Sequence, residues 1–251
     1  MVQLGIEITE LAKTFERRDT PAVAARENLL RLRKLAELTL DVKPTAREVL
    51  DVGVGFWYST AVLRCAYPAA EITGLEYPQA PMWQHSAWRN AGKRYADRVI
   101  ERDSLTAGEL PDRYDVVAAC EILEHIEPSR LIPLLASWRG ILCSGGVLVG
   151  TMPNFSCVLN RLLFLTHGGT SMELPQVRPY GTYDHLREYT ADEFTRILRL
   201  AGYSHSIIRF AARPRAWVRS TRWPRAADLI ERGAGALAPR SLGQIVFAAR
   251  P

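Results

Sequence analysis

Between residues 48 and 151, short apolar segments alternate with longer segments of helical pattern, and this alternation constrains the fold more than any other feature. The apolar segments are almost continuously hydrophobic, as is typical of parallel strands that are covered on both faces. We therefore predict a doubly wound α/β sheet of seven mostly parallel strands, with helices on both faces and ligands at the carboxyl ends of the strands. Strands are expected at 48–52, 71–75, 98–100, 114–119, 146–151, 205–210 and 243–249, and helices at 59–67, 81–95, 128–141 and 190–202.

The first strand ends in the stretch VLDVGVGFWYST, residues 49–60. Gly53 and Gly55 allow a sharp turn after the strand and a close approach of main-chain N–H groups to a ligand. Two glycines alone are also compatible with an ordinary turn. Glu76 adds a second signal, because it ends the next strand 21 residues after Gly55. A carboxylate at that position can accept hydrogen bonds from both hydroxyls of a ribose, so the pattern favours a nucleotide-binding loop.

The order of motifs resembles that of the class I S-adenosylmethionine-dependent methyltransferases, in particular bacterial members from glycan and natural-product biosynthesis. The likeness covers roughly residues 45–205. It rests on VLDVGVGFWYS, ITGLEYP, ERDSLTAGELP, YDVVAACEILEHIEP, LCSGGVLVGTMPN and HLREYTADEFTRILRLAGY. The resemblance implies a Rossmann-like fold. The dehydrogenase pattern GxGxxG is absent, and Asp51 precedes the glycines instead.

The resemblance also assigns roles to individual positions around the cofactor, S-adenosylmethionine. Asp51 would organise the loop and approach the methionine ammonium, and Gly53 and Gly55 would pack beneath the cofactor. Glu76 would hold the ribose. The adenine amino group would meet Asp103 and Ser104, and the methionine or methyl group would be flanked by Cys120 and Glu121.

The sequence departs from the family at Trp57, where many members carry a third glycine. A bulky side chain there must point away from the cofactor or cover it. Trp57 and Tyr58 are candidate substrate contacts that either shield the methionine end or anchor the N-terminal helix, whereas Phe56 is expected to pack plainly. Tyr183 and Arg187 are the other candidate substrate contacts.

Three side chains are candidate bases for a hydroxyl acceptor. His185 is preferred, because histidine titrates near neutral pH and this one lies between an insertion and a well-signalled helix. Glu124 and His125 follow the fourth strand and are the reserve. The alternative is that Glu124 and His125 cap the next helix, and that His185 and Arg187 organise their loop. A metal would be possible if Glu and Asp side chains converged, but no metal-ligand spacing is visible, so none is predicted.

The flanking segments are expected to embellish one methyltransferase domain at 45–251. Residues 1–44 are predicted to form a helical lid that also packs on the core, since residues 29–38 carry leucines at an amphipathic spacing. The long insertion at 155–184 follows strand five and would cap the substrate pocket.

The net charge of +5 is concentrated near the C-terminus. Residues 211–251 hold eight arginines and two acidic residues. The embellishment at 211–242 is either a solvated connection or a contact with a membrane or lipid-linked substrate. A nucleic-acid partner is not expected, because the segment lacks lysine and a dense basic run.

Bulk features limit the remaining choices. Four widely spaced cysteines and the lack of an apolar leader favour a reduced, cytoplasmic protein. The sequence therefore predicts an O-methyltransferase acting on a small-molecule hydroxyl, with a sugar or glycan preferred. The alternatives are a lipid, quinone or amine acceptor, or a non-catalytic cofactor-binding protein. The oligomeric state is not predicted.

Overall fold

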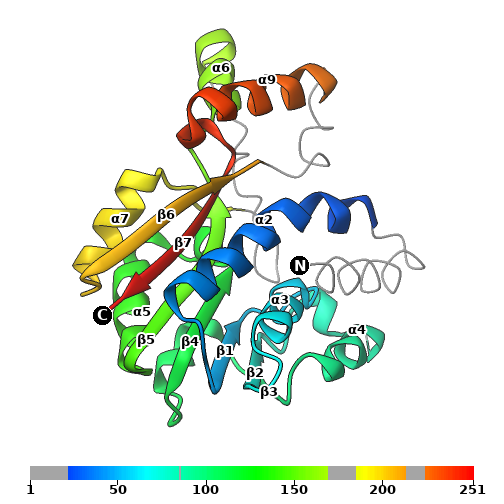
Figure 1. Ribbon diagram of the computed structural model, residues 1–251, viewed down its shortest axis with the longest axis vertical. Helices are drawn as coiled ribbons and strands as arrows, with labels where there is room; N and C mark the ends of the chain where they lie inside the picture. The colour runs from blue at the N-terminus through cyan, green and yellow to red at the C-terminus, as the bar shows by residue number, and fades with distance from the viewer. Residues whose placement is uncertain (1–21, 85, 169–184, 213–223) are drawn as a thin grey trace.

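A seven-stranded sheet forms the centre of the protein (Figure 1). The computed structural model describes residues 22–84, 86–168, 185–212 and 224–251. The spatial order is β3-β2-β1-β4-β5-β7-β6. The strands are β1 (Glu48–Val52), β2 (Glu71–Glu76), β3 (Arg98–Glu101), β4 (Tyr114–Cys120), β5 (Leu142–Pro153), β6 (His205–Ala211) and β7 (Gln244–Arg250).

Strands β1 to β5 pair in parallel, whereas β7 runs antiparallel to both of its neighbours. The predicted seven-stranded α/β sheet is confirmed, as a mixed sheet with a single reversed strand. The chain moves outward from β1 to β3 on one side and from β4 to β6 and β7 on the other. The carboxyl ends of the adjacent β1 and β4 therefore flank the crevice where such sheets bind ligands.

Alternate residues of the central strands belong to two different cores. Val49 and Val116 face the core beneath α2 (Ala22–Val42) and α3 (Tyr58–Ala66). Leu50 and Val117 face the opposite core, which includes residues of α5 (Pro128–Gly140) and α7 (Ala191–Leu200). Side chains of successive strand residues point to opposite faces, so a continuous apolar strand fills both layers.

The capping signal of α7 is confirmed. The Thr190 hydroxyl accepts a hydrogen bond from the Glu193 N–H, and the Glu193 carboxylate accepts one from the Thr190 N–H. This reciprocal box satisfies two N–H groups that the helix start would otherwise leave open.

Two predicted elements differ from the structure. The helix expected at 81–95 is broken into η1 (Pro81–Gln84), α4 (Ser86–Ala91) and η2 (Gly92–Arg94). A Cβ on Gly92 would lie 2.0 Å from the Trp57 side chain. The backbone of this segment therefore packs directly against the indole, and it does so without forming one continuous helix. Strand β5 is longer than expected, because its last residues pair with β7 as far as Pro153 and Gln244.

Helix α2 packs across one face of the sheet and contacts α3, β5, β6 and β7 (Figure 1). Leu32, Leu35 and Leu38 are fully buried there. The predicted packing of this helix on the core is confirmed, whereas residues 1–21 of the expected lid lie outside the described part of the chain.

Two helices lie against each other beyond the carboxyl end of β5: α6 (Val158–His167) and α9 (Pro224–Leu237) (Figure 1). Each belongs to one of the predicted embellishments, at 155–184 and 211–242, and the rest of those segments is described only in part. No described helix combines the length and apolar character needed to cross a bilayer.

Candidate active site

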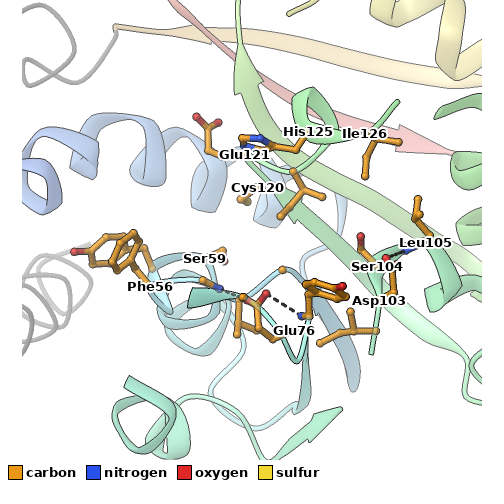
Figure 2. Close-up of a pocket in the computed structure, with 18 of the residues that line it drawn as sticks. Phe56, Ser59, Glu76, Asp103, Ser104, Leu105, Cys120, Glu121, His125 and Ile126 are labelled. Atoms are coloured by element: carbon orange, nitrogen blue, oxygen red, sulfur yellow. Dashed lines mark hydrogen bonds between the residues drawn. The ribbon is translucent and has the colours of Figure 1, made fainter. Parts of the chain in front are cut away.

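A cavity of about 620 Å³ opens at the carboxyl ends of the parallel strands (Figure 2). Figure 2 shows Glu76, Asp103 and Ser104 on one side of it, with Cys120, Glu121 and His125 opposite. The predicted residues that line it are Gly53, Gly55, Tyr58, Glu76, Asp103, Ser104, Cys120, Glu121 and His125. The sequence motifs thus converge on one site.

The loop after β1 is held against β2 by its own backbone. Gly53 and Val54 donate N–H hydrogen bonds to the Leu75 carbonyl, at 2.8 and 3.2 Å. Gly53 has φ +73°, and a Cβ there would lie 2.2 Å from the Ile122 side chain. Glycine is therefore required at this position both for its conformation and for space.

Glu76 ties the same loop to the end of β2. One carboxylate oxygen accepts the Gly55 N–H at 2.7 Å and the other accepts the Tyr77 N–H at 2.9 Å. Burial raises the pKa of Glu76, and these two hydrogen bonds counteract that effect. Each carboxylate oxygen can accept more than one hydrogen bond, so Glu76 retains acceptor capacity toward the cavity.

Asp103 begins the short helix η3 (Ser104–Glu109). Its carboxylate accepts the Leu105 N–H at 2.9 Å, as expected of an N-cap residue. This cap fixes the backbone of Ser104 and Leu105 at the edge of the cavity. Asp103 and Ser104 therefore both line the cavity at the start of η3.

Asp51 is fully buried and does not line the cavity. Its Oδ2 accepts hydrogen bonds from the hydroxyls of Ser59 at 2.8 Å and Thr60 at 2.5 Å, in the first turn of α3. Its Oδ1 has no hydrogen-bond partner among the described residues. Burial raises the pKa of Asp51 to about 7, although the two hydroxyls lower it.

This pKa predicts a pH-dependent stability. The folded chain binds the Asp51 proton up to about pH 7, whereas the unfolded chain releases it near pH 4. The contribution of Asp51 to the free energy of unfolding should therefore decrease by a few kcal/mol as the pH rises from 4 to 7. Denaturant unfolding at several pH values checks this, with Asp51→Asn expected to show the shallower dependence. Equal slopes would mean that Asp51 titrates in its ordinary range.

Cys120 ends β4 and Glu121 directly follows it, and both line the cavity. Desolvation and the nearby carboxylate of Asp51 raise the pKa of the Cys120 thiol, so it stays neutral. Glu121 has φ +56°, a left-handed conformation that is uncommon for a non-glycine residue. Its N–H donates to the Thr151 carbonyl, and its carboxylate accepts a hydrogen bond from the Thr151 hydroxyl at 3.0 Å.

Arg31 is a site residue that the sequence analysis missed. It extends from α2 to the cavity, where its guanidinium lies 2.5 Å from the Glu121 carboxylate and 3.2 Å from the Thr151 hydroxyl. The sequence feature that could have indicated it is an arginine next to the buried leucine face of an amphipathic helix. Arg31 links α2 to the end of β4.

The three candidate bases lie together. Glu124 and His125 belong to η4 (Leu123–His125), whose Glu124 carbonyl accepts N–H hydrogen bonds from Leu186 and Arg187. This places His185 beside them, with its ring centroid 5.0 Å from that of His125. Burial raises the pKa of Glu124 well above its ordinary value, and the charge of Glu121 raises it further.

The structure corrects the expectation for Trp57. Its side chain is fully buried, lies 5.7 Å from the ring of Trp83, and does not line the cavity. The residue has φ +65° and directly precedes α3. The indole therefore points away from the loop into the core, in the space that Gly92 leaves open.

The other candidate substrate contacts differ in position. Tyr58 lines the cavity and stacks against Phe56, at 5.9 Å between centroids. Arg187 does not line the cavity. It pairs with Glu193 at 2.9 Å and lies over the ring of Tyr189, so it supports the start of α7. Tyr183 lies outside the described residues.

The residues around the cavity fit S-adenosylmethionine on structural grounds. Gly53 provides a surface without a side chain, and the buried Asp51 Oδ1 is an acceptor without a partner in the described chain. Glu76 has spare acceptor capacity at the position expected for the ribose. The volume is also in the range of small-molecule and cofactor sites.

Comparison with known sequences finds methyltransferases. The chain is 29% identical over 201 residues to trans-aconitate 2-methyltransferase of Variovorax paradoxus, covering 78% of this chain and 70% of that protein. It is 26% identical over 160 residues to a ubiquinone biosynthesis O-methyltransferase of Aeromonas salmonicida, and spans 62% of that protein's length. No protein-family profile matches the chain.

Solved structures with the same fold include methyltransferases and a protein in complex with SAM. One is a SAM-dependent methyltransferase from Archaeoglobus fulgidus, with a TM-score of 0.54, 17% identity and coverage of 90% of this chain and 97% of the other. DhpI, in a complex with SAM and HEP, gives a TM-score of 0.56 at 15% identity over 97% of this chain and 94% of the other. The resemblance inferred from the motifs is thus confirmed: in sequence and in fold, this chain is a relative of the class I S-adenosylmethionine-dependent methyltransferases.

Proposed function

We propose that the protein transfers a methyl group from S-adenosylmethionine to a hydroxyl of a small molecule. One observation carries the proposal: a single cavity has carboxylates at the positions expected for a nucleotide on one side, and on the other it is lined by His125, which forms a group with Glu124 and His185 behind it. A hydroxyl acceptor must lose a proton, and basic side chains near the methyl group meet that need.

The cofactor would be held mainly by residues at the ends of β1, β2 and β4. Glu76 would accept hydrogen bonds from the ribose, and Asp103 and Ser104 would contact the adenine. Asp51, buried behind the loop, would act on the ammonium through a water. These assignments agree with the exposure of Glu76, Asp103 and Ser104 to the cavity.

The cofactor supplies an activated methyl group on a sulfonium, which is a good leaving group. The acceptor oxygen forms a bond to the methyl carbon as the carbon–sulfur bond breaks, and the electron pair remains on sulfur. The acceptor proton passes to His185, with Glu124 or His125 as the reserve. Alignment of the oxygen with the carbon–sulfur bond provides much of the rate enhancement.

A sugar or glycan hydroxyl is the preferred acceptor, because the HLREYT segment and the long insertion resemble those of glycan-modifying relatives. A lipid or quinone hydroxyl is the second candidate. It is favoured by exposed apolar side chains on α6 and α9, where Leu165 is 80% and Leu229 is 73% exposed. One relative is also named for ubiquinone biosynthesis.

The variant His185→Ala is expected to lower kcat by at least 100-fold while the Kd for S-adenosylmethionine changes less than threefold. His185 is not among the residues that line the cavity, so cofactor binding should persist. Calorimetry gives the Kd, and transfer of a labelled methyl group gives kcat. Parental turnover in this variant would eliminate His185 from the reaction.

The proposed function is tested by supplying labelled S-adenosylmethionine with sugars and glycans, quinols, carboxylic acids and amines. Transfer to a hydroxyl supports the proposal, and the acceptor class distinguishes its two forms. Cofactor binding with transfer only to an amine or a carboxylate would overturn the hydroxyl assignment. Binding without transfer to any acceptor would favour a non-catalytic cofactor-binding protein.

A further inference from the structure

Glu124, His125 and His185 form a compact group of potential metal ligands. One ligand atom from each side chain lies within 4.8 Å of the ligand atoms of the other two. Two of the residues come from η4 and the third from the segment that precedes α7. The backbone hydrogen bonds from Leu186 and Arg187 to the Glu124 carbonyl hold these segments together. The tertiary fold therefore assembles the group from positions about 60 residues apart in the sequence.

The Glu124 carboxylate is buried in this group without a hydrogen bond. Its side chain is 0% exposed, and neither oxygen has a hydrogen-bond partner in the described part of the chain. The His185 Nε2 lies 3.9 Å from Oε1, beyond hydrogen-bond distance. A buried carboxylate without partners is unfavourable, and native structures usually satisfy such groups with a proton donor or a cation.

Glu188 orients the imidazole of His185 toward Glu124. The Nδ1 of His185 lies 3.0 Å from Glu188 Oε1, and a carboxylate accepts, so Nδ1 carries the proton. The lone pair of His185 is then on Nε2, the nitrogen nearer to Glu124. An outer carboxylate that fixes the tautomer of a histidine in this way is typical of metal-binding histidines.

We propose that Glu124, His125 and His185 bind a divalent transition-metal cation beside the cavity, at the side that His125 lines. One carboxylate and two imidazoles suit Mn²⁺, Co²⁺ or Zn²⁺ better than a cation that prefers oxygen ligands alone. Metal–nitrogen bonds of about 2.0–2.1 Å put neighbouring ligand atoms about 3 to 3.5 Å apart. The three side chains therefore need to close by about an ångström.

The other nearby carboxylate is already engaged. Glu121 pairs with Arg31 at 2.5 Å and accepts a hydrogen bond from the Thr151 hydroxyl. It therefore lies beside the cluster and does not serve as a fourth ligand. Three protein ligands leave coordination positions open, as in metal sites that bind substrate. His125 also lines the cavity, so these positions would face the acceptor.

The role of the cation in methyl transfer rests on the proposed function. The binding of the cation does not. A hydroxyl oxygen held by the cation would have a lowered pKa and a fixed position relative to the methyl group. The acceptor oxygen would then bond to the methyl carbon while the carbon–sulfur bond breaks and its electrons stay on sulfur, and the hydroxyl proton would pass to solvent. His185 would act as a ligand in place of a base.

Metal binding is tested directly on the full chain after chelation and dialysis. Calorimetry with Mn²⁺ and absorption spectroscopy with Co²⁺ should show one cation per chain. Glu124→Gln and His185→Ala should each weaken binding at least tenfold. His205→Ala is the matched control, because His205 is exposed at the start of β6 and outside the cluster, and it should bind as the parent does.

A further variant and an activity measurement distinguish failure of the metal site from failure of the proposed function. His125→Gln should weaken binding similarly, and circular dichroism identifies any variant that fails to fold. Lack of one-to-one binding, or binding that none of the three substitutions weakens, overturns the metal site. Undiminished methyl transfer in chelated protein overturns the role of the cation and leaves the proposed function intact. A bound cation without methyl transfer to any acceptor retains the site and overturns the proposed function.

Discussion

Trp57→Ala is expected to lower the free energy of unfolding by about 3–5 kcal/mol, the range for removing a large buried aromatic side chain. The indole is fully buried against Trp83 and Gly92, so its removal leaves a cavity between the start of α3 and the η2 segment. Urea denaturation followed by circular dichroism measures the loss.

Phe56→Ala is the matched control for this substitution. Phe56 is the neighbouring aromatic residue, is only partly buried and lines the cavity, so the loss of stability should be clearly smaller. If the two variants unfold at the same denaturant concentration, Trp57 does not anchor the core. A normal cofactor Kd in folded Trp57→Ala would further indicate that the indole acts through packing alone.

Glu76→Ala is expected to raise the Kd for S-adenosylmethionine by on the order of 100-fold, or about 3 kcal/mol. Two hydrogen bonds from ribose hydroxyls to a carboxylate account for a loss of this size. The substitution also removes the anchor of the Gly55 N–H, which lies 2.7 Å from the carboxylate. Isothermal titration calorimetry measures the Kd.

Glu101→Ala is the control for Glu76, because the two residues are register partners at the ends of β2 and β3. Glu101 is exposed and outside the cavity lining, so its removal should leave the Kd unchanged. Glu76→Gln should fall between parent and alanine, since its amide oxygen can still accept the Gly55 N–H. An alanine variant with the parental Kd would show that Glu76 does not contact the cofactor.

The site residues at the strand ends could be predicted from the sequence, because the signals for strands and loops are local. Asp51, the two glycines, Glu76 and Asp103 each follow directly from an apolar segment, and parallel strands bring their carboxyl ends to one edge. Cys120 and Glu121 were expected beside the cofactor from the family resemblance, and both line the cavity. Such positions depend on chain direction and strand length, which the sequence specifies.

Residues from other elements could not be located in this way. Arg31 lies in a helix whose packing angle decides whether its side chain meets Glu121. Glu188 contributes by orienting the ring of His185. No local sequence pattern predicts how a helix packs over the end of a strand, and therefore which of its side chains reach the site. The group Glu124, His125 and His185 was not predicted as a metal site for the same reason, since spacing along the chain does not reveal side chains brought together by separate segments.

The sequence by itself determined the α/β class, the seven strands, the capping box of α7 and the loop that joins β1 to α3, because each depends on periodicity or on contacts within a few residues. Only the tertiary structure decided the direction of Trp57, the burial of the Glu124 carboxylate and the position of His185. Those features depend on which surfaces pack together: an open space at Gly92 takes the indole, and two backbone hydrogen bonds to Glu124 bring His185 to η4.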